Sequence, residues 1–206
     1  MINKEKLNIR QARPADFDAI LKLTYEAFLT LELPGREVVN EHYLIQQLKT
    51  NAGVIKELCL VAESAGEIVG HIAHTQATLK TGDNKKLPVA TLAPLSVTPN
   101  LHKSGIGSLL VKTSLAKAKQ AGQLATVVIG HPAYYAKFGF KPASDFNLAL
   151  ADNTSPAYFL IHPFAEMAIT KGTTCHFLPI FDEIASDEQG LKIFHEEFLA
   201  KNYSTN

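Results

Sequence analysis

Residues 91–140 read TLAPLSVTPNLHKSGIGSLLVKTSLAKAKQAGQLATVVIGHPAYYAKFGF, and the order of elements in this run constrains the whole architecture. An apolar strand pattern leads into a loop that contains Gly105 and Gly107, and a helical pattern follows over 104–121. A continuous apolar run at 124–129 then predicts a parallel strand that is covered on both faces. Small residues let backbone N–H groups approach an anion at the positive end of a helix dipole, so the loop predicts a phosphate site.

Two better-known phosphate loops do not fit this sequence. A dinucleotide-binding loop needs a third glycine where this chain has Leu110, and an acidic residue after the next strand, which here ends in Gly130-His131. A nucleotide P-loop needs Gly-Lys-Ser or Gly-Lys-Thr entering the helix, whereas Lys103-Ser104 precedes the glycines. The sequence therefore disfavours a nicotinamide or flavin enzyme, an ATPase and a kinase. A lone Gly-x-Gly also fits an ordinary strand-to-helix connection, and that alternative stays open at this point.

The remaining pattern joins a proline, a histidine, two glycines and a downstream aromatic turn at fixed spacing: Val97-x-Pro99-x-x-His102-x-x-Gly105-x-Gly107, with Tyr135 four residues before Gly139-Phe140. It resembles the acyl-CoA-binding motif and the following strand–turn segment of the GCN5-related N-acetyltransferases (GNAT). The run PAYYAKFGF resembles a bacterial branch of predicted acetyltransferases in that superfamily. The strong resemblance covers about a quarter of the chain, and the rest fits in element order. The family usually has Gln or Arg where this chain has His102, a departure that bears on side-chain contacts more than on the backbone site.

The resemblance implies acetyl-CoA as the co-substrate. In the family, backbone N–H groups of the glycine loop bind the pyrophosphate, and a bulge in the preceding strand makes a slot for the pantetheine arm. Pro94 lies in that strand here, where it cannot donate to the ladder, and it predicts either a bulge or a strand edge. The expected cofactor-binding residues are Leu95, Val97, His102, Lys103, Ser104, Gly105, Ile106, Gly107 and Ser108.

By the same resemblance, two residues are expected to act in catalysis. The backbone N–H of Leu95 would polarise the thioester oxygen. Tyr135 matches the family tyrosine whose hydroxyl lies near the CoA sulfur, and an ordinary phenol is still protonated at neutral pH, so Tyr135 is the expected acid. The alternative for Tyr135 is a packed aromatic with one structural hydrogen bond, a part that we expect Tyr134 to play instead.

The general base stays open. Histidine as a residue type suits this role, and His131 lies close to Tyr135 in sequence, although a loop histidine without this role is the alternative. Glu26, Glu32 and Glu41 fall on two helical patterns that border the acceptor side in this fold, where solvated carboxylates are also common. A water-mediated base is a further alternative. The histidines show no metal-ligand spacing, so no metal site is expected.

Composition restricts the partners and the compartment. The chain has 206 residues with 20 Lys plus Arg against 20 Asp plus Glu, and this zero net charge disfavours nucleic acid and anionic membrane partners. Cys59 and Cys175 are far apart in sequence and are expected to be reduced thiols. The first residues lack the apolar segment of a signal peptide and no run approaches membrane-spanning length, so a cytoplasmic location is expected.

The element pattern predicts one N-acetyltransferase domain over 1–206, with a core at 7–142 and C-terminal strands and a helix at 143–206. The expected fold class is α/β, with a GNAT-like mixed, mostly antiparallel central sheet flanked by helices. Alternating or apolar runs predict strands at 7–13, 58–63, 68–79, 87–97, 146–150, 157–161 and 173–178. Helical spacing predicts helices that start near 14 and that cover 38–48 and 188–201.

The expected function is acetyl-CoA-dependent N-acetyl transfer to a primary amine, by direct attack in a ternary complex. The acceptor would be a small-molecule or peptide amine, and a homodimer is left open. If the C-terminal third pairs as extra strands, its apolar segments 146–150 and 157–161 would wall the acceptor pocket, and the sequence leaves open whether it does. A non-catalytic acyl-CoA-binding regulatory module on the same fold is the alternative.

Overall fold

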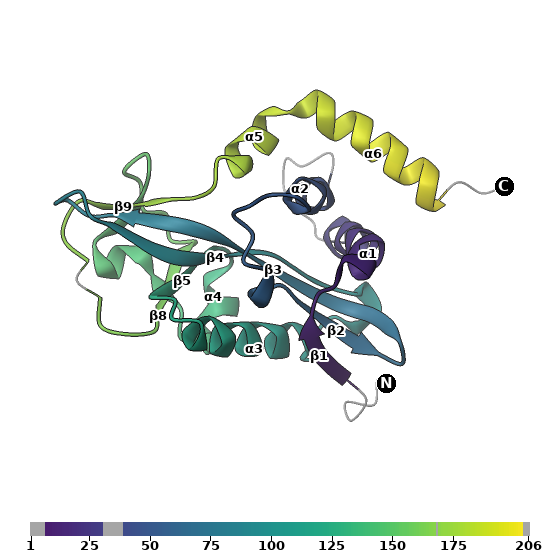
Figure 1. The fold of residues 1–206 in the computed structure, drawn as a ribbon, viewed down its shortest axis with the longest axis horizontal. Coiled ribbons are helices and arrows are strands. Elements are labelled where there is room, and N and C mark those ends of the chain that lie inside the picture. Colours follow the sequence, from purple (N-terminus) through teal and green to yellow (C-terminus); the bar gives the residue numbers. More distant parts are fainter. Residues whose placement is uncertain (1–6, 31–38, 168, 204–206) are drawn as a thin grey trace.

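The computed structural model describes residues 7–30, 39–167 and 169–203, and it shows one continuous nine-stranded sheet with helices on both faces (Figure 1). The strand order is β1-β2-β3-β4-β5-β8-β6, while β9 pairs with β3 and with β7. The pairs β4–β5 and β7–β9 are parallel, and the other pairs among the described strands are antiparallel. The predicted α/β class with a mixed, mostly antiparallel sheet is therefore confirmed.

The strands share the apolar or alternating runs that the sequence shows, and most boundaries shift by only a few residues. They are β1 (Leu7–Gln11), β2 (Leu60–Ser64), β3 (Glu67–Lys80), β4 (Lys86–Val97), β5 (Ala125–Ile129), β6 (Lys141–Pro142), β7 (Leu148–Leu150), β8 (Phe159–Pro163) and β9 (Thr173–His176). The strands expected beyond residue 143 are present. β8 pairs with β5 and β9 pairs with β3, so both extend the central sheet.

The helices are divided between the two faces of the sheet (Figure 1). On one face lie α1 and α2, with α5 and α6 above them, and on the other face lie α3 and α4. Their bounds are α1 (Phe17–Leu29), α2 (Glu41–Leu48), α3 (Ile106–Gln120), α4 (Pro132–Tyr135), α5 (Ile180–Ser186) and α6 (Glu188–Tyr203). Short 3-10 turns connect them: η2 (Pro14–Asp16), η3 (Lys56–Leu58), η4 (Pro99–Leu101), η5 (Ala136–Phe138) and η6 (Ala143–Phe146).

The long helix α3 is bounded by glycines at both ends. Gly105 precedes it with a φ of 95° and Gly122 follows it with a φ of 75°, and both are left-handed conformations that suit glycine. On its inward face Leu110 and Val111 are fully buried, whereas the neighbouring Leu109 is 41% exposed. The packing of α3 on the sheet sets this rotation, and one residue along a helix turns the face by about 100°.

A glycine in β3 lets α3 approach the sheet closely. A Cβ atom at Gly70 would lie 2.9 Å from Ile106 Cγ2 and 3.0 Å from Leu110 Cδ1. The two apolar side chains thus occupy the space above the bare backbone, in a core that also contains Leu60 and Ile72. This packing fixes the start of α3, and with it the glycine loop, relative to the sheet.

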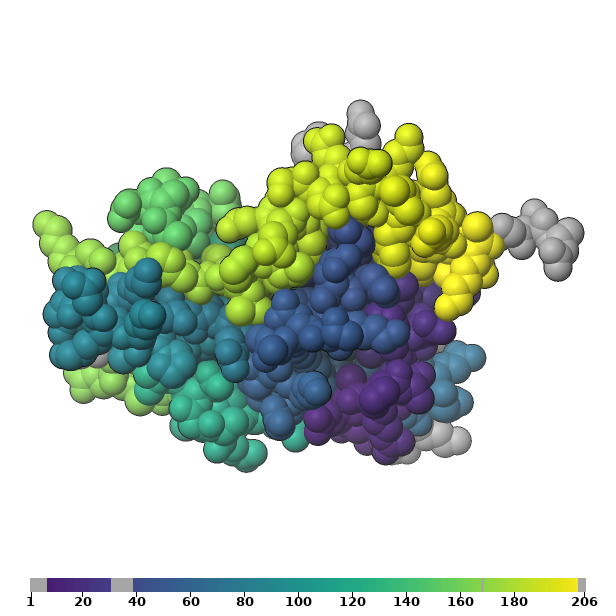
Figure 2. Space-filling view, turned by 45° about the horizontal axis from the view of Figure 1, so that its top comes forward, coloured from purple at the N-terminus to yellow at the C-terminus, as the bar shows by residue number. Residues whose placement is uncertain are grey.

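The C-terminal helix α6 covers α1 and α2, as the yellow surface over blue and purple shows in Figure 2. Phe198 is buried at the contact, with Phe194 and Leu199 packed beside it, and Leu191 is half-buried. Two tyrosine hydroxyls tie the helices together: Tyr43 donates to Asp187 at 2.6 Å and Tyr203 donates to Glu26 at 2.8 Å.

Three buried histidines predict a loss of stability in acid. Burial lowers the pKa of His42 to about 4, of His71 to about 3 and of His74 to about 4, from an ordinary 6.5. The unfolded chain therefore binds protons that the folded protein excludes as the pH falls from 6.5 toward 4. We expect each histidine to remove about 1.4 kcal/mol of unfolding free energy per pH unit in this window. Urea unfolding at several pH values measures the slope, and an unfolding free energy that stays constant down to pH 4 would contradict it.

The described cysteines Cys59 and Cys175 are unpaired, in agreement with the sequence prediction. None of the helices within 7–30, 39–167 and 169–203 has the length and apolar character needed to span a bilayer.

Candidate active site

Strands β4 and β5 part from one another at the centre of the sheet. They are paired only at Ala90–Thr126 and Thr91–Val127, so the rest of β4 runs on without β5 beside it. The register between β3 and β4 also shifts here, since Ile72 lies opposite Leu95 but His74 lies opposite Leu92. β4 therefore holds one extra residue in the segment that contains Pro94. Of the two alternatives that Pro94 left open, a bulge and a strand edge, the bulge is present, beside a gap between two parallel strands.

The backbone groups of β4 beyond the bulge point into this gap. Thr98 N–H donates to the Val69 carbonyl on β3 at 3.1 Å. Because hydrogen-bonded and non-hydrogen-bonded pairs alternate along an antiparallel ladder, Ser96 also faces β3, while Leu95 and Val97 direct their N–H and C=O groups away from it. On that side β5 has already diverged. The gap thus presents two backbone donors, from Leu95 and Val97, that lack a strand partner in the described part of the sheet.

The glycine loop presents further N–H donors at the start of α3. Lys103 and Gly105 have left-handed φ angles of 61° and 95°, which turn the loop sharply. The Ser104 N–H is engaged by the Leu101 carbonyl at 3.2 Å, and that of His102 by Pro99. The N–H groups of Ile106, Gly107 and Ser108 have no carbonyl one turn earlier in the helix to receive them. This cluster of donors at a helix N-terminus suits an anion.

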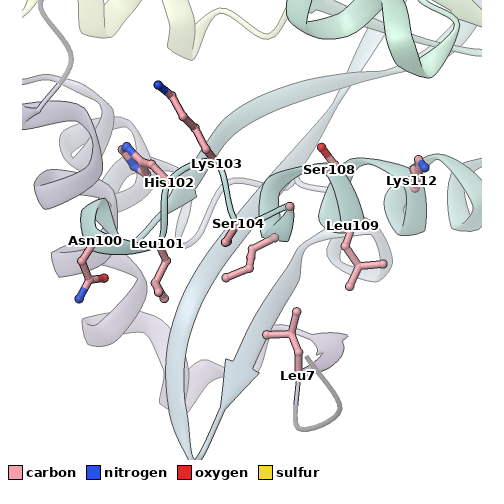
Figure 3. Close-up of a pocket in the computed structure, with 11 residues that line it drawn as sticks. Leu7, Asn100, Leu101, His102, Lys103, Ser104, Ser108, Leu109 and Lys112 are labelled. Atoms are coloured by element: carbon pink, nitrogen blue, oxygen red, sulfur yellow. The ribbon is translucent and has the colours of Figure 1, made fainter. Parts of the chain in front are cut away.

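Side chains of the loop point to two sides of it, as Figure 3 shows. Lys103 and Ser108 point to one side, while Leu101 and Leu109 point to the other, toward Leu7 of β1. The surrounding cavity has a volume of about 860 Å³. A cationic side chain and a hydroxyl therefore flank the donor cluster on a single side of the loop.

His102 is held away from this cluster. Its Nε2 atom hydrogen-bonds the Val97 carbonyl at 2.8 Å, which fastens the loop to the end of β4. The Ser104 hydroxyl is buried without a hydrogen-bond partner among the described residues. Both residues lie in the predicted loop, but their contacts in the structure are with the protein chain, and their role toward a cofactor stays a prediction.

The two adjacent tyrosines have different surroundings. Tyr134 is half-buried, and its hydroxyl lies only 2.9 Å from the point that a Cβ at Gly107 would occupy. Tyr135 is 8% exposed and packs edge-on against Phe140. Burial raises the pKa of Tyr135 far above the ordinary value of 10, so its phenol keeps its proton at neutral pH. The structure thus separates a tyrosine on the loop side from one on the pocket side.

A pocket of about 610 Å³ lies where Tyr135 meets the gap. Its wall includes Leu95 from β4, the end of β5, His131, and side chains from α1, α2 and the segment after β9. Tyr135 and Leu95, the two predicted catalytic residues, are therefore brought together at one cavity. The C-terminal third lines this pocket through Phe177 and Phe181, whereas no residue of 146–150 or 157–161 lies among the described lining residues.

The structure also separates the carboxylates that the sequence left open as bases. Glu41 lines the same pocket as Tyr135, whereas Glu26 accepts a hydrogen bond from Tyr203 and borders a different, polar cavity. Glu32 lies outside the described residues. His131 is exposed at the pocket wall. Of the candidate general bases, Glu41 and His131 are therefore the ones that line the pocket at the gap.

Gly130, directly after β5, sets the position of Tyr135. A Cβ atom at Gly130 would overlap the Tyr135 ring. We expect Gly130→Ala to displace this ring and to lower kcat by about 100-fold, because a misplacement of about 1 Å can cost that much. Steady-state kinetics and calorimetric titration with acetyl-CoA measure the effect. A variant with lost cofactor binding, or with unchanged kcat, would contradict this role.

Comparisons with known proteins agree with this geometry. The family model of the acetyltransferase (GNAT) domain matches residues 8–143. This chain belongs to the GNAT acetyltransferase family. The family and the fold class predicted from the sequence are confirmed.

Relatives of this GNAT chain are named as N-acetyltransferases. The uncharacterized N-acetyltransferase YjhQ of Escherichia coli K12 is 34% identical over 101 residues, which are 49% of this chain and 55% of that protein. The uncharacterized N-acetyltransferase YhbS of the same strain is 25% identical over 168 residues, which are 80% of this chain and 92% of that protein. The alignment with YjhQ thus spans about half of that relative's length.

Two solved GNAT structures were determined with CoA species bound. A GNAT family acetyltransferase from Brucella melitensis in complex with acetyl-CoA has a TM-score of 0.68 at 27% identity, over 85% of this chain and 98% of that chain. The Escherichia coli YhbS structure in complex with CoA has a TM-score of 0.71 at 24% identity, over 86% of this chain and 92% of that chain, a likeness of fold.

Within the described ranges, no three His, Cys, Asp or Glu side chains are grouped to hold a metal ion.

Proposed function

We propose that this protein is an acetyl-CoA-dependent N-acetyltransferase that acylates a primary amine by direct attack in a ternary complex. The observation that carries the proposal is the gap between β4 and β5, with the N–H groups of Leu95 and Val97 directed into it and Tyr135 beside it. Residues 1–206 act as one domain, since β8 and β9 extend the sheet of the core. The free thiols Cys59 and Cys175 favour the proposed cytoplasmic location.

The residues present fit acetyl-CoA. The first-turn N–H groups of α3, flanked by Lys103, suit a pyrophosphate. The absence of a side chain at Gly107 leaves room for the Tyr134 hydroxyl to lie close to the loop backbone. The donors of Leu95 and Val97 suit the amide groups of an extended arm, which would pair with β4 as a strand does. When bound, acetyl-CoA supplies an activated acetyl thioester.

The position of each residue at the gap supports the catalytic role that we propose for it. The Leu95 N–H points into the gap and is placed to stabilise negative charge on the thioester oxygen. Tyr135, protonated and at the pocket wall, donates its proton to the leaving sulfur. One carbon–nitrogen bond forms and one carbon–sulfur bond breaks, while the amine loses a proton and the thiolate gains one. Glu41 or His131, directly or through water, receives the proton from the amine.

Product analysis with a broad amine panel tests the proposal. Wild-type protein, acetyl-CoA and primary amines are incubated, and free thiol release is measured together with the mass of the amine product. The expected result is an acetylated amine formed in step with thiol release. Tight acetyl-CoA binding without transfer to any amine would instead indicate the non-catalytic regulatory module.

A further inference from the structure

The side chains that line the pocket beside Tyr135 bear on which acceptor it can bind. Four half-buried apolar side chains line it: Phe28 from α1, Leu44 from α2, and Phe177 and Phe181 from the segment at the start of α5. The rings of Phe177 and Phe181 meet edge-on with their centroids 6.0 Å apart. Helix α5 contacts α2, so these two rings from the C-terminal third lie on the same pocket as the side chains of α1 and α2.

One carboxylate interrupts this apolar wall. Glu41 lies three residues before Leu44, on the same face of α2, and both line the pocket. Among the described lining residues, Glu41 is the one side chain with a carboxylate, and none of them is a lysine or an arginine. A carboxylate offers about four acceptor positions, so a contact with a neighbouring group still leaves room for an ammonium.

We infer that the acceptor is a primary monoamine with a bulky apolar body, whose ammonium is drawn to Glu41 and whose body packs against Phe28, Leu44, Phe177 and Phe181. This inference rests on the proposed acetyltransferase function and adds its substrate class. A second cation, as in a polyamine, would lie desolvated against apolar walls. A carboxylate next to the amine would lie close to Glu41 and be repelled, which excludes free amino acids.

A matched pair of amines tests the charge requirement. 2-Phenylethylamine and L-phenylalanine share the same ring and differ by one carboxylate. We expect kcat/KM for 2-phenylethylamine to exceed that for L-phenylalanine and for spermidine by about 100-fold. In Glu41→Gln, which keeps the volume of the side chain, the preference over L-phenylalanine is expected to shrink about tenfold. A wild-type protein that prefers spermidine or amino acids would overturn the inference.

A second pair of variants tests the apolar wall. Phe181→Ala is expected to raise KM for 2-phenylethylamine about tenfold with acetyl-CoA affinity unchanged. Phe146→Ala is the control, because Phe146 is also half-buried in the C-terminal third but does not line the pocket. Equal KM values in the two variants would contradict the assignment.

Binding measurements test the inferred acceptor class separately from the proposed acetyltransferase function. 2-Phenylethylamine is titrated into the CoA-loaded protein, and saturable binding that weakens in Phe181→Ala supports the inference without any need for turnover. Absence of this binding, in a protein that binds acetyl-CoA and acetylates other amines, overturns the acceptor class and leaves the proposed function intact. Absence of acetyl-CoA binding itself overturns both.

Discussion

Replacement of Tyr135 with phenylalanine is expected to lower kcat by about 100- to 1,000-fold and to leave acetyl-CoA affinity unchanged. The hydroxyl is the one polar group of the Tyr135 side chain, whose ring packs against Phe140 and close to Gly130. The variant therefore keeps the packing of the ring and loses the proton donor. Burial raises the pKa of the Tyr135 phenol, and the proton is therefore present throughout the neutral range. Thiol-release kinetics give kcat, and calorimetric titration gives the affinity.

Tyr134→Phe is the matched control for this experiment. The Tyr134 hydroxyl lies over Gly107, on the loop side of the site. Its loss should raise KM for acetyl-CoA and leave kcat close to the wild-type value. If the two variants lost kcat to the same extent, or if Tyr135→Phe kept full activity, Tyr135 would not be the acid.

Replacement of Gly105 with glutamate is expected to weaken acetyl-CoA binding by at least about 100-fold. Two unit charges of like sign about 4 Å apart near a protein surface repel by about 4 kcal/mol, which corresponds to about 1,000-fold in affinity before salt screening. The new carboxylate would stand among the N–H donors at the start of α3, where the pyrophosphate is proposed to bind.

The same helix offers a matched control at its other end. Gly122, like Gly105, has a left-handed φ and open space around its would-be Cβ. Gly122→Glu therefore imposes a similar backbone strain and the same charge, about a helix length from the loop. We expect both variants to lose a similar amount of thermal stability, and only Gly105→Glu to lose binding. Equal affinities in the two variants would remove the phosphate site from this loop.

The parts of the fold that local spacing controls could be predicted from the sequence. Pro94 removes a backbone donor, and the bulge it indicated is present in β4. The glycines that bound α3 and the four-residue interval from Tyr135 to Gly139 are local patterns, and the elements they predicted are in place. Each of these features depends on backbone conformations that a few neighbouring residues determine.

The acceptor side of the site could not be predicted in the same way. Phe177 and Phe181 reach the pocket because β9 pairs with distant β3, and no pattern near them indicates that pairing. Glu26 and Glu41 look equivalent in sequence, and only the fold places Glu41 at the pocket and Glu26 beside Tyr203. The hydrogen bond between His102 and the Val97 carbonyl likewise depends on the three-dimensional path of the loop.

The most direct test of the central claim is a crystal structure of the wild-type protein grown with CoA. We expect the pantetheine arm between β4 and β5 with its amides on the Leu95 and Val97 backbone, the pyrophosphate on the N–H groups from Gly105 to Ser108, and the sulfur beside the Tyr135 hydroxyl. CoA bound elsewhere on the protein, with the gap between β4 and β5 closed, would contradict the account.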